Sequence, residues 1–215
     1  MNKKLIMRGG AMLLAGLLAL SLFGCSSGER KAAPFQVVFT AARVNESAVS
    51  EFAASMLNEI PELTIDGNAP LFTPMVVAET QNNTEGAITA DPMMAMAGIM
   101  RQAAMVSTND IDVFISDMNN AARNARGDMF LPLGEIFTDA ELAAMSGRLL
   151  SFDLVSADGY EATPTGAKTP ICGIDITDNE TMRRIFGGQE VGVFIVANTK
   201  NYELAKKVMT SLISN

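Results

Sequence analysis

The sequence predicts an α/β fold with a doubly wound, mainly parallel sheet, and three observations lead to this expectation. Short apolar runs alternate with helix-like segments throughout residues 35–215, a pattern typical of strands joined by helical crossovers. The run at 111–115 is almost unbroken apolar, which is typical of a strand buried on both faces. Polar residues follow it at once at 116–120, and open α/β sheets bind their ligands at such strand ends.

The first half of the predicted domain contains three strands and three helices. The strands are expected at 35–42, 75–80 and 111–115, and the helices at 45–60, 92–107 and 118–126. Pro74 confines the second strand to the residues after it, and 81–89 has the composition of a polar loop. Asp91 and Asp117 are plausible N-caps of the second and third helices, and Gly127 is a plausible C-cap.

The second half alternates in the same way. Strands are expected at 149–154 and 191–197, and helices at 138–147, 177–186 and 201–213. Thr138 and Thr177 each precede a Glu at capping-box spacing, and Asn201 is a plausible cap of the last helix. A stretch rich in Gly, Pro and Thr lies within 151–170 and predicts a long loop or a hinge.

The N-terminal residues predict export from the cytoplasm. An apolar run at 11–23 follows three cations. It is shorter than the roughly 20 apolar residues that a membrane-spanning helix needs, and this combination is typical of a secretion signal. The run ends in L-F-G-C, which resembles the lipobox of bacterial lipoproteins, although Phe23 is unusual there. The resemblance implies a signal peptide at 1–24, lipidation of Cys25 and a tether at 25–34. A plain signal peptide or membrane anchor is the alternative. We therefore expect a lipid-anchored protein on the extracytoplasmic face of the cell membrane.

Charge and cysteine content exclude several functions. The formal net charge is −8, and removal of residues 1–24 would make it more negative, because that segment holds three cations and no anion. An acidic surface argues against nucleic-acid binding and against docking to anionic lipid. With Cys25 lipidated, Cys172 remains alone, so no internal disulfide is expected. Cys172 lies in an apolar run, which predicts a buried, inert thiol.

Four segments resemble a known family. D-I-D-V-F at 110–114 and G-D-M-F-L-P-L at 127–133 resemble the middle of bacterial extracytoplasmic solute-binding proteins of ABC importers. Two later segments are similar to the closing strand and helix of that family: I-C-G-I-D at 171–175, and residues 191–208, which begin with V-G-V-F. The resemblance implies a periplasmic-binding-protein-like fold of type II and an ABC permease as partner. Most members are longer, so the second lobe is expected to be small or incomplete.

We expect the solute to bind where strand ends face helix starts, because backbone N–H groups and short polar side chains can satisfy a polar ligand there. Arg43 could pair with a carboxylate or another anion, and a simple surface arginine is the alternative. The candidate ligand-binding residues are Thr40, Arg43, Asn45, Glu79, Asn82, Asp91, Ser116, Asp117, Asn119 and Asn120.

Metal, cofactor and enzyme chemistry find little support in the sequence. A soft-metal site at Met93, Met96 and Met100 is less common than a methionine-lined core or binding surface. The carboxylates near Asp175 do not have the EF-hand spacing for Ca²⁺. The chain has no His and lacks the motifs of serine hydrolases, NTPases and dinucleotide-binding enzymes. We expect no metal, no cofactor and no enzymatic activity.

The sequence therefore predicts a lipid-anchored binding protein that delivers a small polar solute to an ABC-type importer. A second hypothesis is a surface lipoprotein that keeps the fold and works as an interaction or accessory module. The small size of the chain and the absence of Trp favour this alternative slightly, because many sugar-binding clefts are lined by aromatic residues.

Overall fold

The strand β1 (Gln36–Ala41) lies inside a mixed sheet, and all six of its residues are buried. The computed structural model describes residues 33–77, 92–108, 110–156 and 163–214. Within the described part, Ala33 onward forms one compact unit. The expected ligand-binding residues Glu79, Asn82 and Asp91, the loop at 81–89 and everything before residue 33, including Cys25, lie outside the described residues.

Six strands form the sheet in the order β2-β1-β3-β8-β7-β4. The other members are β2 (Leu71–Val76), β3 (Val113–Asp117), β4 (Leu149–Leu150), β7 (Gly173–Asp175) and β8 (Val191–Ile195). β2, β1 and β3 run parallel, whereas β8 is antiparallel to both β3 and β7, and β4 is antiparallel to β7. The α/β class is confirmed.

The prediction of a mainly parallel sheet is wrong for the half that contains β8, β7 and β4. Apolar runs reveal how many strands there are, but not the direction in which each one enters the sheet. The segment between β7 and β8 contains one short helix and is long enough for either a parallel crossover or an antiparallel return. Tertiary packing decides between the two, and here the chain returns beside the strand it has just left.

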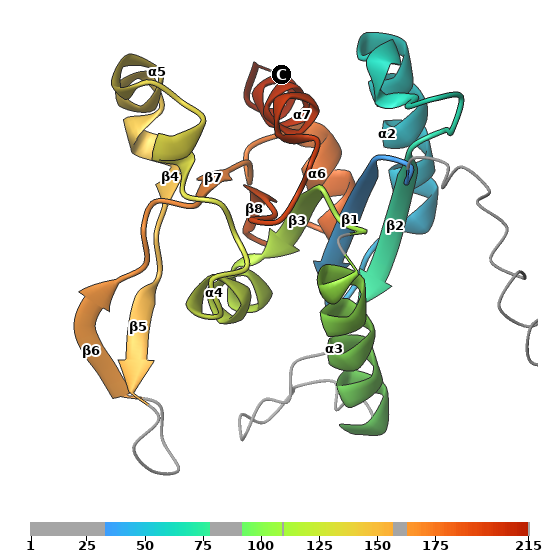
Figure 1. Cartoon of the computed structure of the whole chain (residues 1–215). Helices are drawn as coiled ribbons and strands as arrows, with labels where there is room; N and C mark the ends of the chain where they lie inside the picture. The colour runs from blue at the N-terminus through green and yellow to red at the C-terminus, as the bar shows by residue number, and fades with distance from the viewer. Residues whose placement is uncertain (1–32, 78–91, 109, 157–162, 215) are drawn as a thin grey trace, which may run out of the picture. The chain divides into compact units, whose positions relative to one another are not determined.

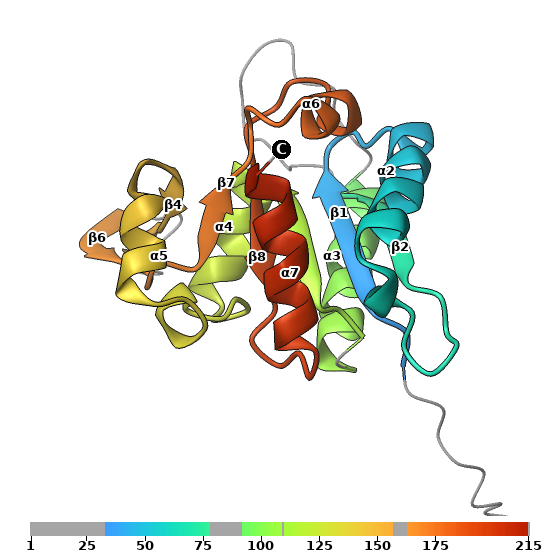
Figure 2. The same ribbon diagram turned by 90° about the horizontal axis from the view of Figure 1, so that it is seen from above.

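Helices cover both faces of the sheet (Figures 1 and 2). One face carries α2 (Glu46–Glu59), α6 (Glu180–Phe186) and α7 (Tyr202–Ser214), and the other carries α3 (Pro92–Ser107) and α4 (Met118–Arg126). Successive side chains of β1 point to opposite faces of the sheet, because side chains alternate along a strand. Val37 and Phe39 pack in the core beneath α2, α6 and α7, whereas Val38 packs in the core on the α4 side.

Most predicted helix ends are confirmed. The Asn45 side chain accepts a hydrogen bond from the Ala48 N–H at 3.2 Å, and Thr138 and Glu141 form the expected capping box of α5 (Asp139–Ala144). The capping box predicted at Thr177 is wrong, because Asn179 is the N-cap of α6. The Thr177 hydroxyl instead accepts a hydrogen bond from the Val191 N–H at 3.0 Å, so it is engaged with the start of β8.

The second strand lies earlier than predicted, at Leu71–Val76 rather than 75–80, and it includes Pro74. β2 forms the edge of the sheet and pairs only with β1. Proline is tolerated on an edge strand because one side of such a strand makes no ladder hydrogen bonds. The sequence does not show which strands lie at the edge of the sheet. The prediction therefore excluded Pro74 from the second strand and placed that strand too late in the chain.

A hairpin replaces part of the loop or hinge predicted within 151–170. β5 (Asp153–Ser156) pairs with β6 (Thr163–Lys168) in antiparallel fashion, and β4 and β5 together replace the single strand predicted at 149–154. Every residue of β6 is exposed. The hairpin is therefore held by backbone pairing with few buried side chains, which explains why apolar patterning did not reveal it. Three short 3-10 helices complete the described part: Pro61–Leu63, Leu133–Glu135 and Ser146–Arg148.

The Phe194 side chain packs closely over two glycines. Gly173 lies directly opposite Phe194 in the β7–β8 pair, and a Cβ atom at Gly173 would come within 2.1 Å of the phenyl ring. At Gly192 a Cβ atom would meet the same ring at 2.7 Å. The ring also stacks on Phe130, with 4.4 Å between the ring centroids. Neither glycine position has room for a larger side chain.

We predict that Gly173→Ala lowers the free energy of unfolding by about 1–3 kcal/mol, because the added methyl group overpacks against a ring that Phe130 holds in place. Urea denaturation followed by circular dichroism measures the change. Gly134→Ala is the matched control, because nothing lies within 4 Å of a Cβ atom at Gly134. Equal stability of the two variants would show that the ring can move aside.

A buried carboxylate joins β1, the residue before β3 and the segment between β8 and α7. Asp112 precedes β3, and its Oδ2 atom accepts a hydrogen bond from the Gln36 N–H of β1 at 2.8 Å. Its Oδ1 atom accepts hydrogen bonds from the Thr199 hydroxyl and, at 3.0 Å, from the Asn201 side-chain amide. Asn201, predicted as a helix cap, thus binds Asp112 through its side chain. Three donors from β1 and from the segment between β8 and α7 converge on this carboxylate.

We predict that Asp112→Ala lowers the free energy of unfolding by about 3 kcal/mol, because it leaves several donors without an acceptor in a largely buried place. Chemical denaturation of the variant and the wild type measures this. Asp153→Ala removes an exposed carboxylate that pairs with Lys168 at 3.8 Å and should change stability by less than about 1 kcal/mol. A similar effect of both substitutions would contradict the role given to Asp112.

Candidate functional site

Four of the predicted ligand-binding residues form one buried hydrogen-bond network at the carboxyl ends of β1 and β3. The Thr40 hydroxyl donates to the Ser116 hydroxyl at 3.0 Å, as expected from the direct pairing of these two residues in the parallel strands. The Ser116 hydroxyl donates to the Asp117 carbonyl oxygen at 3.1 Å. The Asp117 carboxylate accepts hydrogen bonds from the Asn120 backbone N–H and side-chain amide, both at 2.8 Å.

This network confirms the N-cap predicted at Asp117, but its polar groups bind one another. All four side chains are buried, and together they join β1 to β3 and start α4. Asn120 also accepts a hydrogen bond from the Arg123 guanidinium at 2.6 Å, which extends the network along α4. Asn119, the neighbouring predicted residue, is exposed. The geometry thus gives these buried residues a structural role at the predicted edge.

Two further predicted residues line a separate hollow. Arg43 and Asn45 lie beside Arg184 and the turn after α6, around a space of about 350 Å³. Asn45 is engaged as the N-cap of α2, and Arg184 pairs with Glu51. Arg43 is exposed, as in the alternative interpretation of a surface arginine. The buried polar groups of the Thr40 network do not line this hollow.

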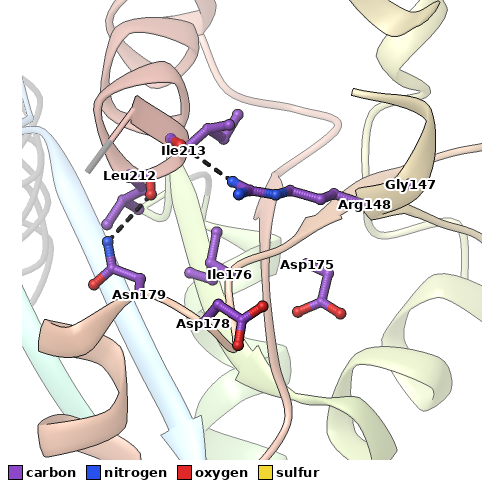
Figure 3. Close-up of a pocket in the computed structure, with 8 residues that line it drawn as sticks. All are labelled: Gly147, Arg148, Asp175, Ile176, Asp178, Asn179, Leu212 and Ile213. Atoms are coloured by element: carbon purple, nitrogen blue, oxygen red, sulfur yellow. Dashed lines mark hydrogen bonds between the residues drawn. The ribbon is translucent and has the colours of Figure 1, made fainter. Parts of the chain in front are cut away.

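A second polar hollow lies at the C-terminal end of α7 (Figure 3). Arg148 donates to the Ile213 carbonyl oxygen at 3.1 Å, and Asn179 donates to the Leu212 carbonyl oxygen at 3.2 Å. These side chains satisfy carbonyl groups that the end of a helix leaves unpaired. The Asp178 carboxylate pairs with Arg183 at 2.8 Å. This hollow, of about 150 Å³, is accounted for by helix capping.

The described residues contain no group of three or more His, Cys, Asp or Glu side chains placed to hold a metal ion. Cys172, the thiol in the described part of the chain, is buried. Burial raises the pKa of the Cys172 thiol, and a hydrogen bond with Thr169 offsets part of that rise. A raised thiol pKa keeps the side chain protonated near neutral pH, which makes it a poor nucleophile.

A mostly apolar hollow lies between α3 and α4, on one face of the sheet. We call it the α3–α4 pocket. Its volume is about 490 Å³, within the range typical of small-molecule sites. Its lining residues are Ile99, Gln102, Ala103, Val106, Ser107, Arg123, Asn124, Gly127, Asp128, Met129, Ala197 and Asn198.

Backbone pairing between two distant segments builds one wall of the α3–α4 pocket. Phe130 forms a bridge with Val196, and the Ala197 N–H donates to the Met129 carbonyl oxygen at 2.9 Å. Because Phe130 stacks on Phe194, the ring over the two glycines also fixes this pairing. Met129 and Ala197 are thereby held side by side at the pocket.

Two buried polar atoms of the α3–α4 pocket residues have no hydrogen-bond partner among the described residues: the side-chain oxygen of Gln102 and the side-chain nitrogen of Asn124. Gln102 is 4% exposed and Asn124 is 9% exposed. Within the described part of the chain, the amide nitrogen of Gln102 donates to the thioether of Met129 at 4.0 Å, and a thioether is a weak acceptor. Each unpartnered group costs about 1–3 kcal/mol. A ligand or water with a donor and an acceptor would offset that cost.

Arg123 connects the α3–α4 pocket with the predicted strand-end residues. Arg123 is exposed and lines the pocket, and its guanidinium donates to Asn120, which is itself held by the Asp117 carboxylate. Asp117 and Asn120 therefore do not line the pocket, but they hold a residue that does. Asp128, exposed and with a φ of 53°, lies at the same pocket.

Sequence reasoning missed Gln102 and Asn124, although a weak signal was present. Gln102 lies on the same helical face as Ile99 and Val106, at a spacing of three and four residues. Asn124 lies on α4 three residues after the buried Ala121. A polar residue at a core position of each of two helices is a sign of a site, but only their packing shows that the two residues share one pocket.

Comparisons with protein-family models, curated protein sequences and solved structures find no match to this chain. Among the described residues, no helix is both long enough and apolar enough to span a membrane. The sequence and the geometry of the α3–α4 pocket are therefore what indicate the function.

We predict that Gln102→Met raises the free energy of unfolding by about 1 kcal/mol, because it replaces an unpartnered buried carboxamide with an apolar side chain of similar size. Thermal and urea denaturation measure the change. Gln189→Met is the control, since Gln189 is only half-buried and its side chain is not among the buried unpartnered groups. A loss of stability in Gln102→Met alone would mean that the carboxamide is satisfied in solution.

Proposed function

We propose that this chain is a lipid-anchored extracytoplasmic binding protein that takes a small solute into the α3–α4 pocket and delivers it to an ABC-type importer. The observation that carries the proposal is a pair of buried amide atoms without a partner among the described residues, the side-chain oxygen of Gln102 and the side-chain nitrogen of Asn124, contributed by residues that line a mostly apolar pocket of about 490 Å³. Polar groups few in number and set in apolar walls are the usual composition of small-molecule sites.

The resemblance to solute-binding proteins supports the proposal at the same place. Residues 127–133 and 191–208, which are similar to that family, supply five of the pocket residues: Gly127, Asp128, Met129, Ala197 and Asn198. The export signal and the lipobox-like end at Cys25 would place the protein where such importers collect their solutes. The proposal includes a reduced fold of periplasmic-binding-protein type II, with the β5–β6 hairpin in the region where a second lobe would be inserted.

One observation favours the second candidate, an interaction module. Met93, Met96 and Met100 on α3 are 80%, 55% and 66% exposed, and their spacing of three and four residues gathers them on one side of the helix. Flexible methionine side chains are common on surfaces that bind other proteins. Such a module would use this face of α3 and would need no solute.

We predict that a screen of sugars, amino acids, peptides and oxyanions against the chain without its signal peptide yields at least one ligand that raises the melting temperature. Ala103→Trp should abolish that rise, because Ala103 lines the pocket and the indole would fill it. Differential scanning fluorimetry, followed by titration calorimetry, measures both effects.

Ala104→Trp is the matched control, since Ala104 is the next residue of α3, is equally exposed and does not line the pocket. The control variant should keep the ligand response of the wild type. A ligand that still binds to Ala103→Trp would place the site elsewhere. No response to any compound would contradict solute transport and favour the interaction module.

A further inference from the structure

From the chemistry of its walls, we infer that the α3–α4 pocket selects small, neutral amphiphiles that carry an amide group, a ligand class that rests on the proposed binding function. An amide offers a C=O acceptor and, if it is primary or secondary, an N–H donor. The two unpartnered carboxamides, Gln102 and Asn124, require that combination.

The requirement for both a donor and an acceptor follows from the two atoms left unpaired. The Gln102 oxygen needs a donor, and the Asn124 nitrogen needs an acceptor. Rotation of both side-chain amides by half a turn exchanges the donor and the acceptor, and a ligand amide can match the exchanged arrangement as well. An ester or ketone, which only accepts, leaves at least one of the buried groups unpaired.

The requirement for a neutral head group follows from the charges around the pocket. The two buried polar side chains are both uncharged, so the interior offers no counter-ion. Arg123 and Asp128, the charged residues that line the pocket, are both exposed and opposite in sign. Arg123 is also engaged with Asn120. A carboxylate or ammonium group would therefore lose its hydration without a dedicated partner inside.

The requirement for an apolar body follows from the remaining walls. Ile99, Ala103, Val106, Met129 and Ala197 contribute hydrocarbon or thioether surface. A short alkyl chain attached to the amide would cover this surface and gain from its removal from water. Sugars, which carry hydroxyl groups on all sides, would leave many of those groups unpaired against these walls.

The test compares three probes of equal chain length: hexanamide, methyl hexanoate and hexanoate. The protein carries ¹³C-labelled methionine methyl groups, and Met129→Leu identifies the Met129 signal among the 15 methionines. We expect hexanamide to shift the Met129 signal with a dissociation constant about tenfold lower than those of the ester and the acid, because only the amide pairs with both buried groups.

The variant Gln102→Leu/Asn124→Leu should lose this preference, so that hexanamide and methyl hexanoate bind equally. The variant removes unpartnered polar groups, and a two-dimensional amide spectrum verifies that it is folded. Ser211→Ala is the control, because the Ser211 hydroxyl is also buried without a partner but lies on α7, away from the pocket. This control should keep the preference for hexanamide.

Two outcomes would overturn the inference. If methyl hexanoate or hexanoate binds as tightly as hexanamide, the amide selectivity is wrong, and solute binding in the pocket stands. If none of the three probes shifts the Met129 signal, the pocket does not select amide amphiphiles. In that case, a compound from the broad screen that Ala103→Trp blocks would still support the proposed function, so the two failures are distinguishable.

Discussion

The packing of the Phe194 ring is the constraint on which the antiparallel half of the sheet and the candidate site both depend. The ring occupies the space that side chains at Gly173 and Gly192 would need, so a larger residue at either position would have to displace the ring. The same ring stacks on Phe130 and contacts Phe152 at 6.1 Å between centroids. Through Phe130, it positions the segment 129–131 against 195–197, which forms a wall of the α3–α4 pocket.

Stability and function make opposite demands on the α3–α4 pocket. A helix pair that packs for stability alone would bury apolar side chains at the positions of Gln102 and Asn124, because unpartnered carboxamides are costly. The two polar groups are retained beside a well-formed core, in which buried side chains cover both faces of the sheet. Local violations of packing rules are expected at functional sites, where the cost is offset by binding.

The candidate residues divide according to the kind of interaction that brings them together. Thr40 and Ser116 were each predicted to bind the ligand because they lie at the ends of apolar strands, and parallel pairing in register makes them partners. Asp117 and Asn120 follow from the local geometry of a helix start. Gln102 and Asn124 belong to different helices, and they line one pocket only because α3 and α4 pack on the same face of the sheet. No local pattern encodes that arrangement.

The sequence by itself determined the α/β class, most of the helices with their caps, and the buried strands, because these depend on apolar periodicity and on short-range hydrogen bonds. It also determined that polar residues gather at the end of β3. Only the tertiary structure decided the directions of β8, β7 and β4, the edge position of β2 with its proline and the hairpin of β5 and β6. These features, like the α3–α4 pocket, arise from contacts between residues far apart in the chain. Local sequence patterns do not show which distant residues meet or how strongly they interact.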